Sequence, residues 1–252
     1  MQLILLKPTS PSKRHYLNIF FNINKKAVLK TKLKKNINSG GRNYFGKITI
    51  RHKGYKHNKK LFRIINFQKI KNLFGIIFSI EYDPFRSANI ASVFNLNMKK
   101  FFYILAPKNI KLGNIIKTGE NIDIKIGNSV IIKKIPIGCP IYNISLKPFH
   151  ISKICRAAGL YGLIINKTLN YCTVILNSGH KINIFNQCFA NIGIVSNQFS
   201  FLKQCGKAGR SRWLNIRPHV KGTSMNPVDH PNGGGEGRKS QSNKNLWGKK
   251  IK

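Results

Sequence analysis

Positive charge is the feature that most limits how this chain can fold. Its 252 residues include 45 Lys and Arg but six Asp and Glu, a formal net charge of +39 at pH 7. Because six carboxylates cannot neutralise that charge from within, the folded chain repels itself when it is alone. A hydrophobic content of 42% is still enough for one core or two small ones. The composition therefore predicts a folded protein that works in contact with a dense polyanion.

The charges are concentrated at the two ends of the chain. Residues 1–60 carry 16 Lys and Arg and residues 201–252 carry 12, whereas the 140 residues between them carry 17. Four of the six acids also lie in that middle segment. We infer an apolar middle with a cationic arm on each side.

The apolar middle has the pattern of β-strands. Ile, Val, Phe and Tyr recur there in short runs, which Gly, Asn and Pro interrupt. Close spacing of short strands favours small β-barrels over βαβ units, so the predicted fold class is all-β. A helix of one or two turns at 151–159 is the single helical prediction. The expected strands include residues 47–50, 74–82, 101–105, 128–132, 172–176 and 181–185.

Both ends of the chain have few apolar side chains that could be buried in a core. Residues 8–42 mix Lys with Asn, Ser and Gly, and residues 203–252 are rich in Gly, Arg, Lys and Asn. Within the second arm, residues 222–238 have almost no aliphatic side chain but several glycines that permit unusual backbone conformations. Since the backbone polar groups of such segments find no partner in a core of their own, we expect the arms to become ordered only on binding.

Cysteine usage and hydropathy limit the cellular compartment and the partners that we expect for this chain. Five cysteines stand 16 or 17 residues apart, without a Cys-x-x-Cys pair or a nearby His to complete a metal site. We expect reduced, mostly buried thiols in a reducing compartment, and no metal bound by the protein alone. No stretch approaches the roughly 18 apolar residues of a membrane helix, and residues 3–6 are too short for a secretory signal. We expect no membrane partner and no small-molecule substrate.

Three short segments combine the residue types that bind nucleic acid. Residues 206–213, Gly-Lys-Ala-Gly-Arg-Ser-Arg-Trp, supply cations for phosphates, glycines for close backbone approach and an indole that can stack on an unpaired base. Residues 40–43 and 51–57 repeat this mixture, and their histidines lie among cations that favour a neutral imidazole. These segments predict a nucleic-acid interface.

A series of motifs runs through the chain in a fixed order. The motifs are Lys-Pro-Thr-Ser-Pro at 7–11, Gly-Gly-Arg-Asn at 40–43, Gly-Lys-Ile-Thr-Ile-Arg-His at 46–52, Glu-Tyr-Asp-Pro at 81–84, Arg-Ser-Ala-Asn-Ile-Ala at 86–91, Tyr-Ile-Leu-Ala-Pro-Lys at 103–108, Arg-Ala-Ala-Gly at 156–159, Gly-Lys-Ala-Gly at 206–209 and Met-Asn-Pro-Val-Asp-His-Pro at 225–231. Over nearly its whole length, the chain resembles the universal large-subunit ribosomal protein two family.

The resemblance implies a fold and a function. It implies an oligonucleotide-binding-type (OB) barrel at 43–126 and an SH3-like barrel at 127–203, with a basic N-terminal extension at 1–42 and a Gly- and Arg-rich C-terminal extension at 204–252. It also implies a structural role in the large ribosomal subunit, with binding to large-subunit ribosomal RNA near the peptidyl transferase region. The implied partners are that RNA, neighbouring ribosomal proteins and, across the subunit interface, the small subunit.

The basic segments and the family motifs coincide, so they give one set of expected RNA-contacting residues. These are Arg14, His15, Arg42, Arg51, His52, His57, Arg86, Arg156, Lys207, Arg210, Arg212, Trp213, Arg217, Lys221, Met225, Asn226, Asp229, His230, Asn232 and Arg238.

The adjacent Asp229 and His230 raise the question of catalysis. A general base needs an orienting partner, and neighbours in a loop rarely orient one another. Asn232 also stands where the family usually has a second His, which removes any scheme with two imidazoles. We expect no enzymatic activity. His230 and Asn232 would bond RNA or water, and Asp229 would cap its turn or orient a hydrated Mg²⁺ shared with RNA.

Further departures from the family fall at turns. Tyr55 and Lys56 stand where it usually has glycines, and the residues from His150 replace its Lys-Gly-Gly turn. In the motif at 81–84 we expect Asp83 to accept backbone amides and Glu81 to pair with Arg86 or a neighbouring Lys.

Two other function classes compete with a ribosomal role. An architectural DNA-binding protein should show groove-reading helices or apolar wedges on β-arms, and a basic nuclease should cluster carboxylates for Mg²⁺. The sequence has neither pattern. A basic architectural nucleic-acid-binding protein outside the ribosome is the alternative that we keep.

Codon bias suggests the compartment. Heavy use of Ile, Asn and Lys indicates AT-rich codons, and the motif at 7–11 leaves no room for an Arg- and Ser-rich transit peptide. We expect a protein made inside an organelle, for a mitochondrial ribosome in the matrix, with the plastid ribosome as the alternative.

Overall fold

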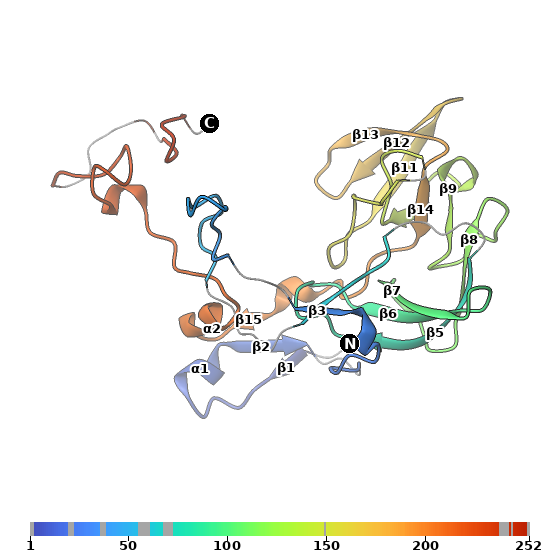
Figure 1. Ribbon diagram of the computed structural model, residues 1–252, viewed down its shortest axis with the longest axis horizontal. Coiled ribbons are helices and arrows are strands. Elements are labelled where there is room, and N and C mark those ends of the chain that lie inside the picture. The colour runs from blue at the N-terminus through green and yellow to red at the C-terminus, as the bar shows by residue number, and fades with distance from the viewer. Residues whose placement is uncertain are drawn as a thin grey trace. The chain divides into compact units, whose positions relative to one another are not determined.

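The computed structural model describes residues 3–19, 23–35, 39–54, 61–67, 73–148, 150–236, 242 and 244–250. The chain divides into two compact units (Figure 1). Unit 1 contains residues 1–37 and 58–207, and unit 2 contains residues 38–57 and 208–252. Residues 38–57 thus group with the C-terminal arm, so the units cut across the four segments expected from the resemblance. Those four boundaries stay a prediction.

The first half of unit 1 is an antiparallel meander (Figure 1). Strands β5 (Leu73–Glu81), β6 (Ile90–Asn95) and β7 (Lys100–Leu105) pair in sequence, and β8 (Ile115–Gly119) pairs with the other edge of β5. Buried and more exposed residues alternate along β5, as expected when successive side chains point to opposite faces. The inward apolar residues belong to a buried cluster that includes Leu73, Ile77 and Val93.

The second half of unit 1 adds six strands. They are β9 (Ser129–Ile131), β10 (Pro140–Tyr142), β11 (Gly162–Lys167), β12 (Tyr171–Leu176), β13 (Lys181–Phe185) and β14 (Phe189–Ile192). Parallel pairing of β8 with β9, with Thr118 opposite Ser129, joins both halves into a ten-stranded sheet in the order β13-β12-β11-β10-β14-β9-β8-β5-β6-β7. The fold class is all-β, an OB-type domain followed by an SH3-like domain, as predicted.

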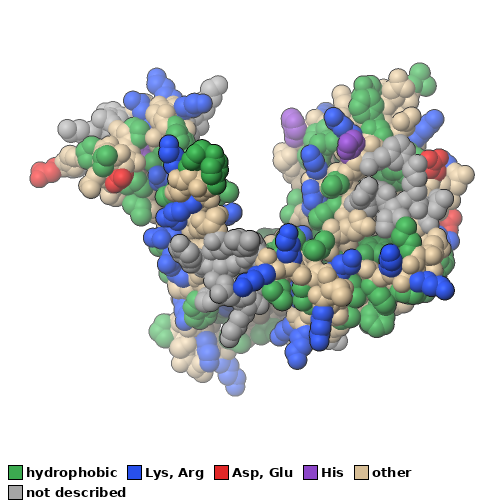
Figure 2. Space-filling view, in the orientation of Figure 1, with side chains coloured by type: hydrophobic (Ala, Val, Ile, Leu, Met, Phe, Trp, Pro, Cys, Tyr) green, Lys and Arg blue, Asp and Glu red, His purple; other side chains and the backbone are tan. Residues whose placement is uncertain are grey.

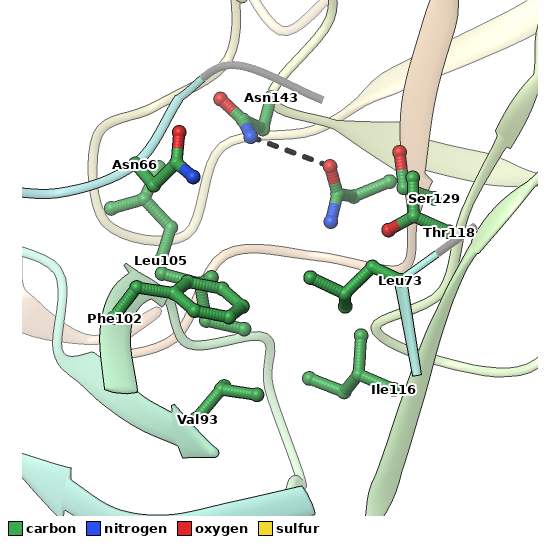
Figure 3. Close-up of a pocket in the computed structure, with 11 residues that line it drawn as sticks. Asn66, Leu73, Val93, Phe102, Leu105, Ile116, Thr118, Ser129 and Asn143 are labelled. Carbon is green, nitrogen blue, oxygen red and sulfur yellow. Dashed lines mark hydrogen bonds between the residues drawn. The ribbon is translucent and has the colours of Figure 1, made fainter. Parts of the chain in front are cut away.

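The two halves share packing at their junction. One buried cluster contains Ile90 and Tyr103 from the first half and Tyr142 and Val195 from the second. A small cavity of about 40 Å³ lies nearby. Figure 3 shows its apolar end, with Phe102 and Ile116, and its polar end, where the Asn143 Nδ2 atom donates to Asn191 at 3.3 Å. This volume is far below the roughly 300 Å³ of a ligand pocket, so the cavity belongs to the packing.

Shorter elements complete the described chain. Strands β1 (Leu3–Leu5), β2 (Tyr16–Ile19) and β15 (Gln204–Cys205) form one sheet, and β3 (Leu33–Lys35) pairs with β4 (Leu61–Arg63). The described α-helices are α1 (Pro11–Arg14) and α2 (Ala208–Trp213), neither long nor apolar enough to span a membrane. Single 3₁₀ turns are η1 (Lys30–Lys32), η2 (Ile132–Lys134), η3 (Ser200–Leu202) and η4 (Gly222–Ser224).

Two sequence predictions of local structure are wrong. Residues 47–50 form no strand, because Ile48 makes only an isolated bridge to Arg42 across a tight turn. Residues 151–159 form no helix, since both Cys155 (φ 53°) and Gly159 (φ 72°) have left-handed backbone conformations that interrupt a right-handed helix. The other five strands listed above are confirmed within one residue at each end.

The thiols agree with the prediction in part. All five cysteines are free. Cys172 and Cys188 are buried, Cys139 and Cys155 are half-buried, and Cys205 is exposed.

Candidate nucleic-acid interface

Within unit 2, the first basic loop (residues 39–54) lies against residues 215–217, at the start of the C-terminal arm. The Gly54 amide donates to the carbonyl of Asn215 at 2.7 Å, and the Arg217 amide donates to the carbonyl of His52 at 2.8 Å. Lys53 also forms a β-bridge with Ile216. These backbone bonds place two cationic segments side by side, although more than 150 residues separate them in sequence. Arg51 belongs to the first segment and Arg217 to the second, and both side chains are exposed.

A pair of imidazoles lies at this contact. The His52 ring stacks on His219, with 4.5 Å between ring centroids and 30° between their planes. The Nδ1 atom of His52 lies 3.2 Å from the carbonyl oxygen of Pro218, so this bond requires the proton on Nδ1. His52 itself has a left-handed backbone, with φ of 60°.

Helix α2 carries the next three predicted residues. Arg210 and Arg212 lie in its last turn, and Trp213 ends it with 54% of its surface exposed. No acid lies in the first turn of this helix. The exposed indole and neighbouring guanidinium groups have the chemistry to stack on a base and bind phosphate.

The loop from Met225 is wound tightly around backbone bonds. The amides of Asp229 and His230 both donate to the carbonyl of Asn226, at 3.0 and 3.2 Å, and the Gly234 amide donates to the carbonyl of Met225 at 3.1 Å. These bonds close the loop without any buried apolar side chain in the described part of residues 222–238.

His230 is held in one orientation within that loop. Its Nδ1 atom accepts the Asn232 amide at 3.0 Å, so the proton of the neutral ring is on Nε2. The ring lies against Gly222, where any Cβ atom would overlap it. The Oδ1 atom of Asn232 is buried without a hydrogen-bond partner among the described residues. The loop thus presents polar groups suited to RNA or water, but no second catalytic side chain beside the imidazole.

Unit 1 carries a separate group of predicted residues near its first sheet. Arg14 and His15 follow one another at the end of α1, and both are exposed. Strand β15 pairs with β2, with Cys205 opposite Tyr16, and Gly206 lies so close to the Ser12 carbonyl that a side chain would overlap it. The antiparallel pairing places exposed Lys207, which follows β15, at the same end of this sheet as Arg14, which precedes β2, although 193 residues separate them in sequence.

Arg86 and Arg156 lie in a partly buried cation–aromatic cluster. The Nη1 atom of Arg86 contacts the Asp83 carboxylate at 2.5 Å and donates to the Arg63 carbonyl at 3.2 Å. The Arg156 guanidinium lies 4.3 Å from the ring centroid of Phe67. Burial, and then the nearby charge of Arg86, lower the pKa of Arg156. Both guanidinium groups thus have contacts within unit 1 itself.

The predicted partner of Glu81 is wrong. Arg86 pairs with Asp83, whose Oδ1 atom also accepts the Phe85 amide at 2.8 Å, as expected of Asp83. Glu81 is fully buried, because it ends the inward face of β5 rather than a surface turn.

The remaining predicted residues do not all come together. Arg42 lies in the first basic loop and Lys221 in the arm, both exposed in unit 2. His57 and Arg238, and the departures Tyr55 and Lys56, lie outside the described residues. Lys and Arg side chains recur over the visible face of both units (Figure 2). Among the described residues, no three His, Cys, Asp or Glu side chains lie together as metal ligands.

Sequence reasoning missed one group of cations. Lys25, Lys26, Lys30 and Arg63 line a single groove in unit 1. The pair of lysines was a visible signal, but Arg63 joins them only through the pairing of β3 with β4.

Comparisons with known proteins agree with this architecture. Residues 25–118 match the RNA-binding N-terminal domain of ribosomal proteins L2, and residues 125–248 match the L2 C-terminal domain. The large ribosomal subunit protein uL2 of Buchnera aphidicola subsp. Cinara cedri is 45% identical over all of this chain and 93% of its own length. The uL2 proteins of Buchnera aphidicola subsp. Schizaphis graminum and Wigglesworthia glossinidia brevipalpis are 46% and 43% identical over 94% of this chain, covering 87% and 86% of their own lengths. The chain belongs to the ribosomal protein L2 family.

Proposed function

We propose that this chain is a structural component of the large ribosomal subunit that binds large-subunit ribosomal RNA. One observation carries the proposal: in the described part of unit 2, the only buried residues are Gly40 and Gly41. A unit with no buried apolar side chain in its described part gains little folding free energy from its own packing. Its cationic surface therefore needs an external polyanion for stability. Family membership identifies that polyanion as ribosomal RNA.

The finer role is also part of the proposal. We infer binding near the peptidyl transferase region, support of subunit assembly, and contact with the small subunit and with neighbouring ribosomal proteins. The loop from Met225 supports contact with RNA, because its hydrogen bonds hold the His230 ring in one orientation. Exposed Asp229 is the candidate for a hydrated Mg²⁺ shared with RNA phosphates.

The protein is a structural component and not an enzyme in itself. In this chain the Nδ1 atom of His230 is occupied by the amide of Asn232. That bond fixes the imidazole, but it supplies no carboxylate to stabilise a protonated ring. The family resemblance implies that peptide-bond chemistry belongs to the RNA.

We propose a mitochondrial ribosome as the compartment, with a plastid ribosome as the alternative. The bias toward Ile, Asn and Lys supports an AT-rich organellar gene. The relatives described above are bacterial proteins, so they support a ribosome of bacterial type and leave the organelle as our inference. Locating the gene in a bacterial chromosome or in nuclear DNA would overturn the organellar origin.

Sedimentation tests the ribosomal role against the alternative of an architectural protein outside the ribosome. In a sucrose gradient of host lysate at moderate salt, the chain should travel with the large subunit. Each Lys or Arg contact with a phosphate makes the binding affinity depend more steeply on salt. Release of the chain from the subunit should therefore need high salt and occur over a narrow salt range. Recovery as a free protein, or with DNA, at moderate salt would reject the ribosomal role.

A further inference from the structure

A basic groove lies beside the first half of the sheet in unit 1. Lys25, Lys26, Lys30 and Arg63 line it, together with Tyr82 and apolar side chains that include Leu61. Its volume is about 620 Å³, within the usual range of about 300–1,000 Å³ for pockets that hold small ligands. None of its residues belongs to the interface predicted from the sequence.

The backbone that carries the lysines is fixed to strand β5. The Asn24 amide donates to the carbonyl of Ile80 at 3.1 Å, and the Tyr82 amide donates to the carbonyl of Asn24 at 2.9 Å. The Val28 amide donates to the buried carboxylate of Glu81 at 3.2 Å. Residues on both sides of Lys25 and Lys26 are thus anchored, which limits the entropy that these side chains lose when they bind an anion.

Arg63 supplies a second sign of a binding site. Only 5% of its surface is exposed, and its Nε atom is buried without a hydrogen-bond partner among the described residues. A buried guanidinium donor without a partner is costly, so a ligand acceptor there would be stabilising.

Among the described residues, no cation that lines the groove forms an ion pair with a carboxylate. The ion pairs among the described residues are Arg86–Asp83 and Lys125–Asp123, and neither includes a groove cation. Four cations around one concave surface create a positive potential that attracts phosphate. Tyr82, which is 43% exposed, adds an aromatic surface on the same groove.

We propose that this groove binds a short single-stranded segment of RNA. The lysines and Arg63 contact consecutive phosphates, and a base lies against Tyr82 and Leu61. Cations alone suit any polyanion, but a groove that also has an aromatic and an apolar side chain suits an unpaired base, which a duplex does not offer. This inference rests on the proposed function and adds to it a defined groove for unpaired RNA in unit 1, apart from the interface residues predicted from the sequence.

Photo-crosslinking at Tyr82 tests the groove directly. The full chain is bound to large-subunit ribosomal RNA of Buchnera aphidicola, transcribed with 4-thiouridine and then irradiated, and cross-linked peptides are identified by mass spectrometry. We expect a cross-link at Tyr82. The double variant Lys25→Gln/Lys26→Gln should reduce it by about tenfold or more, since two phosphate contacts are lost.

A matched variant controls for total charge. Lys34 and Lys35 are exposed on β3, close in sequence, and are not among the residues that line the groove. Lys34→Gln/Lys35→Gln removes the same charge and should leave the Tyr82 cross-link nearly unchanged. Unlabelled single-stranded RNA should compete for the cross-link, whereas ATP or inorganic phosphate at equal phosphate concentration should not.

The outcomes separate this inference from the proposed function. If the wild-type chain binds the RNA but Tyr82 does not cross-link, or both double variants lose the cross-link equally, the groove is not an RNA site and the proposed function stands. Equal competition by ATP would make the groove a mononucleotide site instead. If the wild-type chain does not bind the RNA at all, the proposed function itself fails.

Discussion

At the scale of single residues, the buried acid Glu81 organises the first half of unit 1. Its carboxylate accepts the hydroxyls of Ser79 at 2.8 Å and Tyr103 at 2.9 Å, as well as the Val28 amide. Tyr103 in turn accepts the Leu29 amide at 3.0 Å. The sequence motif indicated a surface pair because the partners of Glu81 lie up to 53 residues away, where no local pattern reveals them.

Tyr103→Phe should destabilise the protein at neutral pH and alter its response to alkali. The change removes the donor to Glu81 and leaves the partly buried Leu29 amide without its acceptor, which should lower the unfolding free energy by about 1–3 kcal/mol. Burial raises the pKa of Tyr103 from 10.0 to about 12. Since the native state holds this proton more tightly, the stabilisation is complete below pH 10 and is lost as pH rises through about 12.

Urea denaturation of wild type and variant from pH 8 to 12 checks this prediction. The difference in unfolding free energy should be constant up to about pH 10 and should shrink above it, because only the wild type loses the contribution of Tyr103. Burial also raises the pKa of Tyr142, which is common to both proteins and cancels in the difference. A difference that stays constant to pH 12 would contradict the proposed ionisation.

At the scale of elements, sequence patterns reveal strands better than loops. Alternation with period two marks β5, and short apolar runs mark β12 and β13, because one side chain in two must face a core. The loop from Met225 lacks such a signal. Its shape comes from backbone bonds and from the contact of His230 with Gly222, so composition could predict a binding loop but not its conformation.

Gly222→Ala should weaken RNA binding through this loop. The new Cβ atom would overlap the His230 ring and displace it from the Asn232 amide. We expect the Kd for large-subunit ribosomal RNA to rise about two- to tenfold, the effect of one lost hydrogen bond. Gly179→Ala is the control, because it strains a turn of unit 1 that lies outside the predicted interface and its Cβ atom meets nothing within 4 Å. Equal affinities of the two variants, measured by filter binding at one salt concentration, would show that the orientation of His230 does not matter for binding.

At the scale of the whole molecule, the two units are stabilised differently. Unit 1 contains three buried apolar clusters, whereas the described part of unit 2 is joined by backbone bonds and ring contacts. The charge map predicted such a contrast between a core and its arms. It did not predict that residues 38–57 join the C-terminal arm, because the Gly54–Asn215 bond is non-local and involves only backbone atoms, which carry no sequence signature.

Limited trypsin digestion of the chain tests this contrast, because both units offer cleavage sites. Without RNA, cleavage after Arg212 and Lys221 in unit 2 should precede cleavage after Lys117, in β8, and Lys181, in β13, by an order of magnitude or more. Sites in a segment without a core open locally, whereas sites in paired strands require a larger opening. Large-subunit ribosomal RNA should slow cleavage at the first pair of sites far more than at the second. If the RNA-free chain resists trypsin equally at all four sites, then unit 2 is stable alone, and the inference that RNA stabilises it is wrong.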